Sequence, residues 1–128
     1  MILGLGTDII EVDRIAKMIA DHGDHFLNRI FTANEIAHCQ PRREFAQHYA
    51  GRWAAKEAVM KALGTGFTPD VGWTNIEIVV RPSGQPCVVL HGNTRDYADS
   101  LGIGEILVTI SHTRTVATAT AIALPRAA

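Results

Sequence analysis

The sequence has few cysteines, no long apolar segment and no excess of charge of either sign. Cys39 and Cys87 are the two cysteines among 128 residues, too few and too isolated for a disulfide framework or a zinc site. No apolar run approaches the roughly 20 residues of a membrane-spanning helix, and the N-terminal residues lack the basic segment and cleavage pattern of a signal peptide. We therefore expect a cytoplasmic protein with no membrane partner.

Charge is balanced over the whole chain but not along it. Twelve Lys and Arg residues stand against 13 Asp and Glu residues, giving a net charge of -1, which predicts neither a nucleic-acid nor a membrane partner. Residues 14–61, however, carry eight basic side chains and five acidic ones. An anionic ligand would find its partners in that stretch.

The composition and the order of the predicted elements indicate one folded α+β domain over residues 1–128. Apolar residues make up 47% and charged residues 20% of the chain, as in an ordinary globular domain. Strands and helices are interspersed with hairpins, which argues against a doubly wound sheet. Strands are predicted at 2–10, 76–80, 87–90, 105–110 and 116–124. Helices are predicted from Asp13 as N-cap to about 21, from the Thr32–Glu35 capping box, over 45–63, and from Asn93 or Thr94 to about 101.

The first strand has an unusual face. Alternation places Gly4, Gly6 and Asp8 on the same side. Two glycines and a carboxylate leave nothing large to pack, so either another backbone or a ligand must come close there.

The helix over 45–63 also has two distinct sides, and Gly64 is suited to close it in a left-handed conformation. One side is smooth, formed by Ala54, Ala55, Ala58 and Ala62, and suits close packing against a sheet or another helix. The other side mixes basic groups with a central carboxylate and comprises Arg52, Trp53, Lys56, Glu57, Met60, Lys61 and Gly64.

Asp8 and Glu57 form a candidate metal pair, because Mg²⁺ is commonly held by one or two carboxylates with waters and substrate phosphates. The alternative is that Asp8 caps a turn and Glu57 pairs with Lys61 four residues later. Arg52, Lys56 and Lys61 flank this carboxylate and could neutralise a diphosphate. The alternative for these cations is a solvated helix face with weak ion pairs.

Weaker candidates lie at the ends of elements. The Gly64-Thr65-Gly66 loop could present N–H groups to a phosphate, but it follows a helix rather than preceding one, so Gly64 is interpreted chiefly as a helix stop. Ser111 and His112 sit at a strand end, where they could reach a ligand or simply close the hairpin. His22 and His25 are interpreted as surface residues, and the two cysteines as ordinary half-buried side chains.

Four segments are distinctive when they are taken in order. They are Gly4-Leu5-Gly6-Thr7-Asp8-Ile9-Ile10-Glu11, Arg29-Ile30-Phe31-Thr32-Ala33-Asn34-Glu35, Gly51-Arg52-Trp53-Ala54-Ala55-Lys56-Glu57-Ala58 and Ile110-Ser111-His112-Thr113. Together they closely resemble the small holo-(acyl carrier protein) synthase group of the 4′-phosphopantetheinyl transferases, from the first strand to the last hairpin. The resemblance implies the single-domain fold of that family, with a mainly antiparallel sheet packed against helices.

The resemblance also implies an activity and its ligands. The family transfers the 4′-phosphopantetheine arm of coenzyme A to a serine of apo acyl carrier protein for fatty acid biosynthesis, with Mg²⁺, and releases adenosine 3′,5′-bisphosphate. By analogy Asp8 and Glu57 are metal ligands and, with Lys61, catalytic. The positions matching coenzyme A contacts are Arg43, Arg52, Lys61, Gly64, Ser111 and His112, of which Arg43, with Arg42, lies in the family's basic segment for the 3′-phosphate.

Partners and assembly follow from the same resemblance. Arg14, Met18 and Phe26 match the positions where the family docks its acidic carrier protein. Family members generally form homotrimers with a site between neighbouring subunits. The general base stays open between a metal-bound water and Glu57. Two other functions also stay open, namely an adaptor that binds without transferring and a metal-dependent phosphohydrolase.

Overall fold

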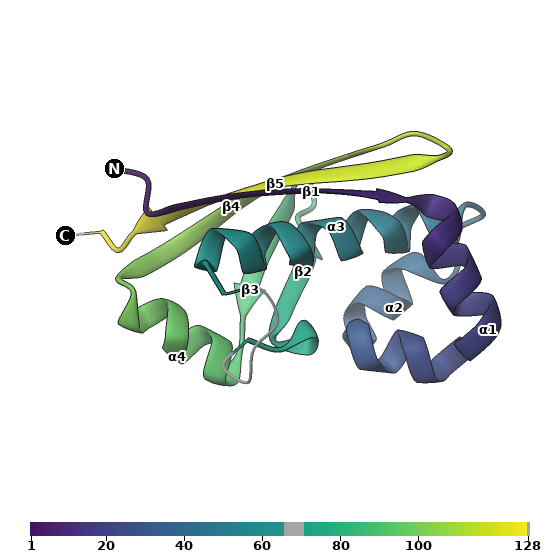
Figure 1. Ribbon diagram of the computed structural model, residues 1–128, viewed down its shortest axis with the longest axis horizontal. Helices are drawn as coiled ribbons and strands as arrows, with labels where there is room; N and C mark the ends of the chain where they lie inside the picture. The colour runs from purple at the N-terminus through teal and green to yellow at the C-terminus, as the bar shows by residue number, and fades with distance from the viewer. Residues whose placement is uncertain (66–70, 128) are drawn as a thin grey trace.

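The strands and helices follow one another in a mixed order along the chain (Figure 1). The computed structural model describes residues 1–65 and 71–127, so Gly66 of the predicted loop lies outside the described residues. The elements are β1 (Gly4–Glu11), α1 (Val12–Ile30), α2 (Ala33–Cys39), α3 (Phe45–Leu63), the short 3₁₀ helix η1 (Trp73–Asn75), β2 (Ile76–Val80), β3 (Pro86–Leu90), α4 (Gly92–Ser100), β4 (Ile103–His112) and β5 (Val116–Pro125).

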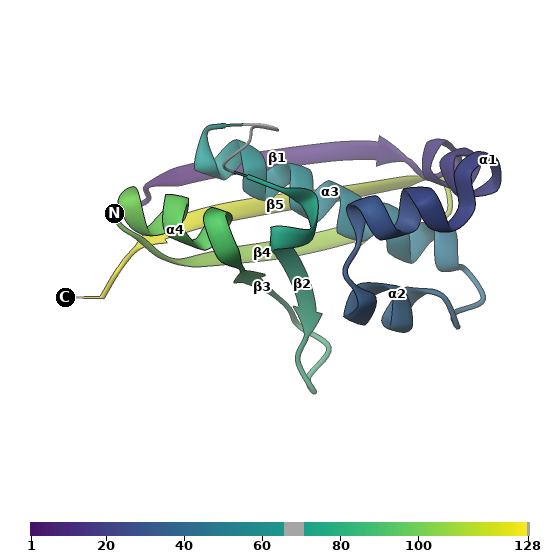
Figure 2. The same ribbon diagram turned by 90° about the horizontal axis from the view of Figure 1, so that it is seen from below.

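The sheet that organises the molecule is antiparallel and has three strands in the order β1-β5-β4. Its two edges are therefore β1 and β4, with β5 between them (Figure 2). Helix α3 lies along one face of this sheet, and the antiparallel β2–β3 hairpin lies on the far side of α3 from β1. The predicted α+β class is confirmed. Among the described residues, no helix is both long and apolar enough to cross a bilayer.

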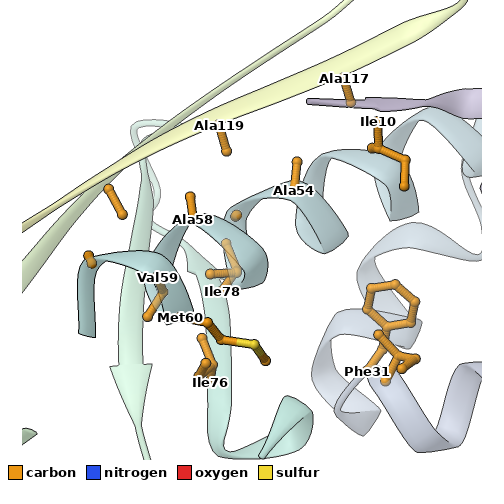
Figure 3. Close-up of a cluster of buried hydrophobic side chains, with 14 of the residues drawn as sticks. Ile10, Phe31, Ala54, Ala58, Val59, Met60, Ile76, Ile78, Ala117 and Ala119 are labelled. Atoms are coloured by element: carbon orange, nitrogen blue, oxygen red, sulfur yellow. The ribbon is translucent and has the colours of Figure 1, made fainter. Parts of the chain in front are cut away.

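Alanines join α3 to the sheet. The four alanines of the smooth helix side are buried, and so are the four that alternate along β5: Ala117, Ala119, Ala121 and Ala123. Figure 3 shows Ala54 and Ala58 directed toward β5, the strand that carries both Ala117 and Ala119. Side chains this small let the helix and strand backbones approach closely, so the predicted close packing is confirmed, with the sheet as its partner.

Glycines continue this close contact onto β1. A Cβ atom built on Gly4 would lie 2.0 Å from the carbonyl oxygen of Ala62, and one built on Gly6 would lie 1.9 Å from that of Ala58. Both distances are far below van der Waals contact. Of the two explanations for the glycine face, the approach of another backbone is therefore correct.

Gly6→Ala is expected to destabilise the fold severely, by about 3 kcal/mol or more, because β1 and α3 must separate to admit the methyl group. Denaturant unfolding measures the loss. Gly72→Ala is the matched control, since the described atom nearest to its Cβ would be the Nδ2 atom of Asn75, at 3.4 Å. Equal unfolding midpoints for the two variants would contradict the close approach.

Local signals predicted several helix ends correctly. The Thr32–Glu35 capping box is present, with both reciprocal hydrogen bonds. Helix α3 spans the predicted residues 45–63, and Gly64 ends it at φ 81°. The first helix breaks at Gly23 as expected, where φ is 52° and ψ is -133°, but helical structure resumes beyond it as far as Ile30.

Two predicted caps are wrong. Helix α1 begins at Val12 with Glu11 as its N-cap, because β1 stays paired to Val116 as far as Glu11 and leaves no room for a cap at Asp13. Helix α4 has His91 as its N-cap instead of Asn93 or Thr94. The Thr94 hydroxyl is buried and accepts a hydrogen bond from the Gly72 N–H (3.2 Å), so it serves a distant segment rather than its own helix.

Candidate active site

Strand β1 and helix α3 bring Asp8, Glu57 and Lys61 together. The Lys61 ammonium donates to the Thr7 carbonyl (2.8 Å) and contacts the Asp8 carboxylate at 3.3 Å. Partial burial raises the pKa of Glu57, the charge of Asp8 raises it further, and Lys61 opposes both. Among the described residues Lys61 thus bonds to β1, and the alternative interpretation, a helix pair between Glu57 and Lys61, is wrong.

Asp8 and Glu57 have the chemistry that Mg²⁺ requires. Within the described ranges 1–65 and 71–127, no group of three or more His, Cys, Asp or Glu side chains could hold a metal by itself. Two neighbouring carboxylates, whose repulsion a single ammonium group offsets, instead suit a cation that takes its remaining ligands from water and substrate phosphate. This pair could therefore hold a magnesium ion jointly with a phosphorylated ligand.

A second cluster lies at the β4 edge. Arg52 is only 7% exposed, and among the described residues its Nε has no hydrogen-bond partner. Arg52 lines a depression together with Val80, Gly84, Pro86, Ile110 and His112. A buried guanidinium N–H without an acceptor is costly, so this depression is suited to an anionic group.

The two clusters lie on opposite flanks of α3. Asp8 belongs to β1 and His112 to β4, the two edges of the sheet, and β5 runs between them (Figure 2). With neighbouring strands about 4.8 Å apart, these edges are separated by about 10 Å of sheet, with α3 packed on it. Sequence reasoning grouped Arg52 with Glu57 and Lys61, but in one chain Arg52 faces the other edge.

Lys56 does not face a ligand, so its predicted role with phosphate is wrong. Its ammonium group is completely buried, 2.7 Å from a Glu35 carboxylate oxygen. It also donates to the carbonyls of Ile30 (3.0 Å), Trp73 (2.9 Å) and Ile76 (2.7 Å). Burial lowers its pKa, and Glu35 opposes that effect. Lys56 is a structural residue that links α3 to α1, α2 and β2.

Lys56→Met is expected to lower the free energy of unfolding by about 3–5 kcal/mol, because Glu35 is left buried without its cation. Lys17→Met is the control: Lys17 pairs with Asp21 at 2.9 Å on the exposed face of α1, where solvent screening leaves an ion pair little effect on stability. The measurement is the denaturant midpoint of both variants. Equal losses would contradict the structural role of Lys56.

The remaining predicted contacts for coenzyme A lie at element ends. Gly64 follows Lys61 on the flank of Asp8 and Glu57, whereas Ser111 is exposed beside His112 at the end of β4. Arg43 is exposed in the segment between α2 and α3.

The predicted docking residues lie on α1. Arg14 is exposed and Met18 is 39% exposed, whereas Phe26 is only 5% exposed and stacks on Trp53 with ring centroids 6.1 Å apart. Met18 and Phe26 nevertheless line one shallow groove with Arg29. Phe26 presents little of its ring to a partner.

The exposure of two histidines and of the two cysteines can be compared with the sequence-based predictions. His22 and His25 are exposed, as predicted. Cys39 is completely buried rather than half-buried, and burial raises the pKa of its thiol to about 11. Cys87 has the intermediate exposure that was expected.

Sequence reasoning missed His38 and His48. Their rings lie 6.3 Å apart between centroids, and the His48 ring is 5.6 Å from that of His112. One signal was available, because His48 precedes Arg52 by four residues and so lies on the same side of α3.

Comparison with known proteins identifies the protein family to which this chain belongs. The family model described as the 4′-phosphopantetheinyl transferase superfamily matches residues 4–120. The holo-[acyl-carrier-protein] synthase of Koribacter versatilis is 45% identical over 122 residues, covering 95% of this chain and 98% of the relative. That of Chlamydia pneumoniae is 48% identical, covering 96% and 98%.

Solved structures agree with these relatives. The holo-[acyl-carrier-protein] synthase of Neisseria meningitidis superposes with a TM-score of 0.90 at 31% identity, covering 97% of this chain and 99% of the other. The Helicobacter pylori enzyme in complex with coenzyme A superposes with a TM-score of 0.84 at 28% identity, covering 94% of this chain and 99% of the other. The chain therefore belongs to the 4′-phosphopantetheinyl transferase superfamily and, within it, to the holo-[acyl-carrier-protein] synthases.

Proposed function

We propose that this protein transfers the 4′-phosphopantetheine arm of coenzyme A to a serine hydroxyl of apo acyl carrier protein, with Mg²⁺, and releases adenosine 3′,5′-bisphosphate. The observation that carries the proposal is the Asp8–Glu57–Lys61 cluster, a pair of carboxylates with one ammonium group in a phosphopantetheinyl transferase fold. Relatives solved with coenzyme A support the choice of donor. Residues 1–128 would act as one transferase domain.

Each residue of the cluster would have a separate role in the transfer reaction. The serine oxygen forms a bond to the phosphorus that carries the pantetheine arm, the bond from that phosphorus to the bridging oxygen of the diphosphate breaks, and the serine proton is released. Asp8 and Glu57 would hold Mg²⁺, which supplies charge neutralisation for the diphosphate. Lys61 fixes Asp8 and adds positive charge beside the diphosphate. Gly64 would lie against the cofactor at the end of α3.

Arg52, Ser111, His112 and the more distant Arg43 would hold the nucleotide end of coenzyme A. Support comes from the unpartnered Nε of Arg52 and from its place beside His112 in the depression at the β4 edge. A phosphate group there would supply the acceptor that Arg52 lacks among the described residues.

We also propose a homotrimer in which each site uses two chains. The cluster of Asp8 and the depression of Arg52 occupy opposite edges of one sheet, so the β1 edge of one copy facing the β4 edge of the next would unite them. The sheet face away from α3 exposes apolar side chains, among them Leu5, Ile9 and Leu107. A second copy would bury them, as head-to-tail contacts in a ring do.

The acidic carrier protein would dock on α1 through Arg14 and Met18, with Phe26 at the floor of the groove. Basic side chains beside an apolar groove suit an acidic partner. Both cysteines are free, as expected for a protein of the reducing cytoplasm, which is the compartment we propose.

The deciding experiment is the intact mass of apo acyl carrier protein incubated with this protein, coenzyme A and Mg²⁺, beside a chelated control. A metal-dependent gain of one phosphopantetheine arm is expected. Binding of coenzyme A without any gain would instead indicate an adaptor. Cleavage of coenzyme A without modification of the carrier protein would indicate a hydrolase.

A further inference from the structure

A group of basic and imidazole side chains lies around the start of α3, and within residues 1–65 and 71–127 no acidic side chain pairs with it. We call it the imidazole cluster, and it is formed by His38 of α2, His48 of α3 and His112 of β4 together with Arg42 and Arg52. Three separate elements contribute to it. The ring-to-ring contacts run in sequence from His38 through His48 to His112.

The charges that act on the central ring, His48, are all of one sign. Burial lowers the pKa of His48, and Arg52, His112 and Arg42 lower it further, in that order. The pKa of His38 is lowered to about 4 by burial, then by Arg52, Arg42 and His48. In the part of the chain that the structure describes, no carboxylate acts on either ring. Glu44, at the N-cap of α3, is exposed.

A second observation points to a ligand. Arg52 is more than nine-tenths buried, and its Nε has no partner among the described residues. It opens into the depression that His112 also lines. Cations and imidazoles that surround a guanidinium without an acceptor form a site suited to an anion. A bound dianion would raise the pKa of the neighbouring imidazoles, the opposite of what the cations do.

We propose that His48 is an additional binding residue for the 3′-phosphate of coenzyme A, and that it takes up a proton when that phosphate binds. The inference rests on the proposed function, which assigns the diphosphate to Asp8 and Glu57 and leaves the monoester phosphate for the β4 edge. His48 lies outside all four of the segments that carry the family resemblance.

The direction of the proton movement follows from the charges. In the ligand-free protein burial, and then the neighbouring cations, lower the pKa of His48 and so favour its neutral form near pH 7.5. A phosphate monoester is almost fully dianionic at that pH, since its second pKa is about 6. Its two negative charges favour the protonated imidazole, so binding draws a proton from solution, and protonated His48 then donates to the phosphate.

The test is calorimetric titration at pH 7.5 in buffers of different ionisation enthalpy, which counts protons taken up on binding. The ligands are coenzyme A and dephospho-coenzyme A, which lacks the 3′-phosphate. For the unaltered protein we expect uptake of about half to one proton with coenzyme A and close to none with dephospho-coenzyme A. For His48→Gln we expect the uptake to vanish and the affinity for coenzyme A to fall about 10-fold, with little change for dephospho-coenzyme A.

His91→Gln is the matched control. His91 contacts Glu77 at 3.0 Å and follows β3 at the end opposite Pro86, which lines the depression. Glutamine can still donate to that carboxylate, and proton uptake should stay unchanged. Uptake that persists in His48→Gln, or that is equal for the two ligands, would overturn the inference while leaving the proposed function intact. Failure of coenzyme A to bind at all would instead contradict the proposed function.

A second measurement serves if His48→Gln does not fold. The imidazole C–H signals of the unaltered protein can be followed by NMR against pH with and without adenosine 3′,5′-bisphosphate. A titration midpoint of His48 that rises by one unit or more with the nucleotide supports the inference, and an unchanged midpoint refutes it.

Discussion

Glu57→Gln is expected to reduce transfer of the phosphopantetheine arm by at least about 100-fold, because the loss of one of two metal-binding carboxylates removes several kcal/mol of charge stabilisation from the transition state. The measurement is the rate of mass gain of apo acyl carrier protein at saturating coenzyme A and at an Mg²⁺ concentration that just saturates the unaltered protein. Raising the Mg²⁺ concentration should restore part of this rate. An unchanged rate would remove Glu57 from the site.

The same variant should not lose stability, which separates a functional role from a structural one. Burial and the charge of Asp8 raise the pKa of Glu57 in the folded protein. Ionised Glu57 therefore destabilises the fold at pH values above that raised pKa, and the effect disappears below the pKa of the unfolded chain. At neutral pH without Mg²⁺, Glu57→Gln should unfold at an equal or higher denaturant concentration.

Asp96→Asn is the control for this substitution. Asp96 is an exposed carboxylate on α4, a helix that contributes no residue to the candidate site, so the change from acid to amide should alter neither turnover nor stability. A marked loss of stability in Glu57→Gln would mean that Glu57 serves the fold rather than the metal.

Mixing two inactive variants is expected to restore activity, because each proposed site draws on two chains. One variant is Glu57→Gln, defective at the β1 edge, and the other is Arg52→Gln, defective at the β4 edge. When the two are coexpressed and purified through two different tags, every trimer contains both chains. In a ring of three, one of its three sites then combines an intact β1 edge with an intact β4 edge, so about one third of the unaltered activity should return.

The contrary outcome is equally clear. If Asp8, Glu57 and Arg52 of the same chain formed one site, every chain in the mixture would carry a defect and activity would stay at the level of the single variants. The assay should use coenzyme A well below saturation, so that the weakened nucleotide binding of Arg52→Gln is not masked. Glu57→Gln mixed with itself under both tags gives the background.

Features that depend on neighbouring residues could be predicted from the sequence. The capping box at Thr32 and the left-handed Gly64 each depend on a few positions along the chain, so their residue types suffice. The smooth alanine side of α3 was predictable for the same reason, since helical periodicity alone places those alanines together.

Features that depend on distant partners could not be predicted in this way. Lys56 has the sequence context of a surface cation, and its burial depends on Glu35 and on carbonyls of residues 30, 73 and 76, which only the folded chain assembles. The separation of Arg52 from Glu57 follows from the strand order, which places β5 between β1 and β4. The residue types of Asp8 and Glu57 made them a candidate metal pair, but an ordinary structural role stayed open for each until the family resemblance was added.

The glycine face of β1 bears on which ion the site would accept. Gly6 precedes Asp8 by two residues and rests on the carbonyl of Ala58, the neighbour of Glu57. The spacing of the two carboxylate-bearing segments is thus fixed by main-chain atoms that cannot be repacked. Mg²⁺ demands a smaller and stricter coordination shell than Ca²⁺ does. Discrimination between these ions would therefore be set by the backbone of β1 and α3, and exchange of the two acidic side chains alone would be a poor way to re-engineer it.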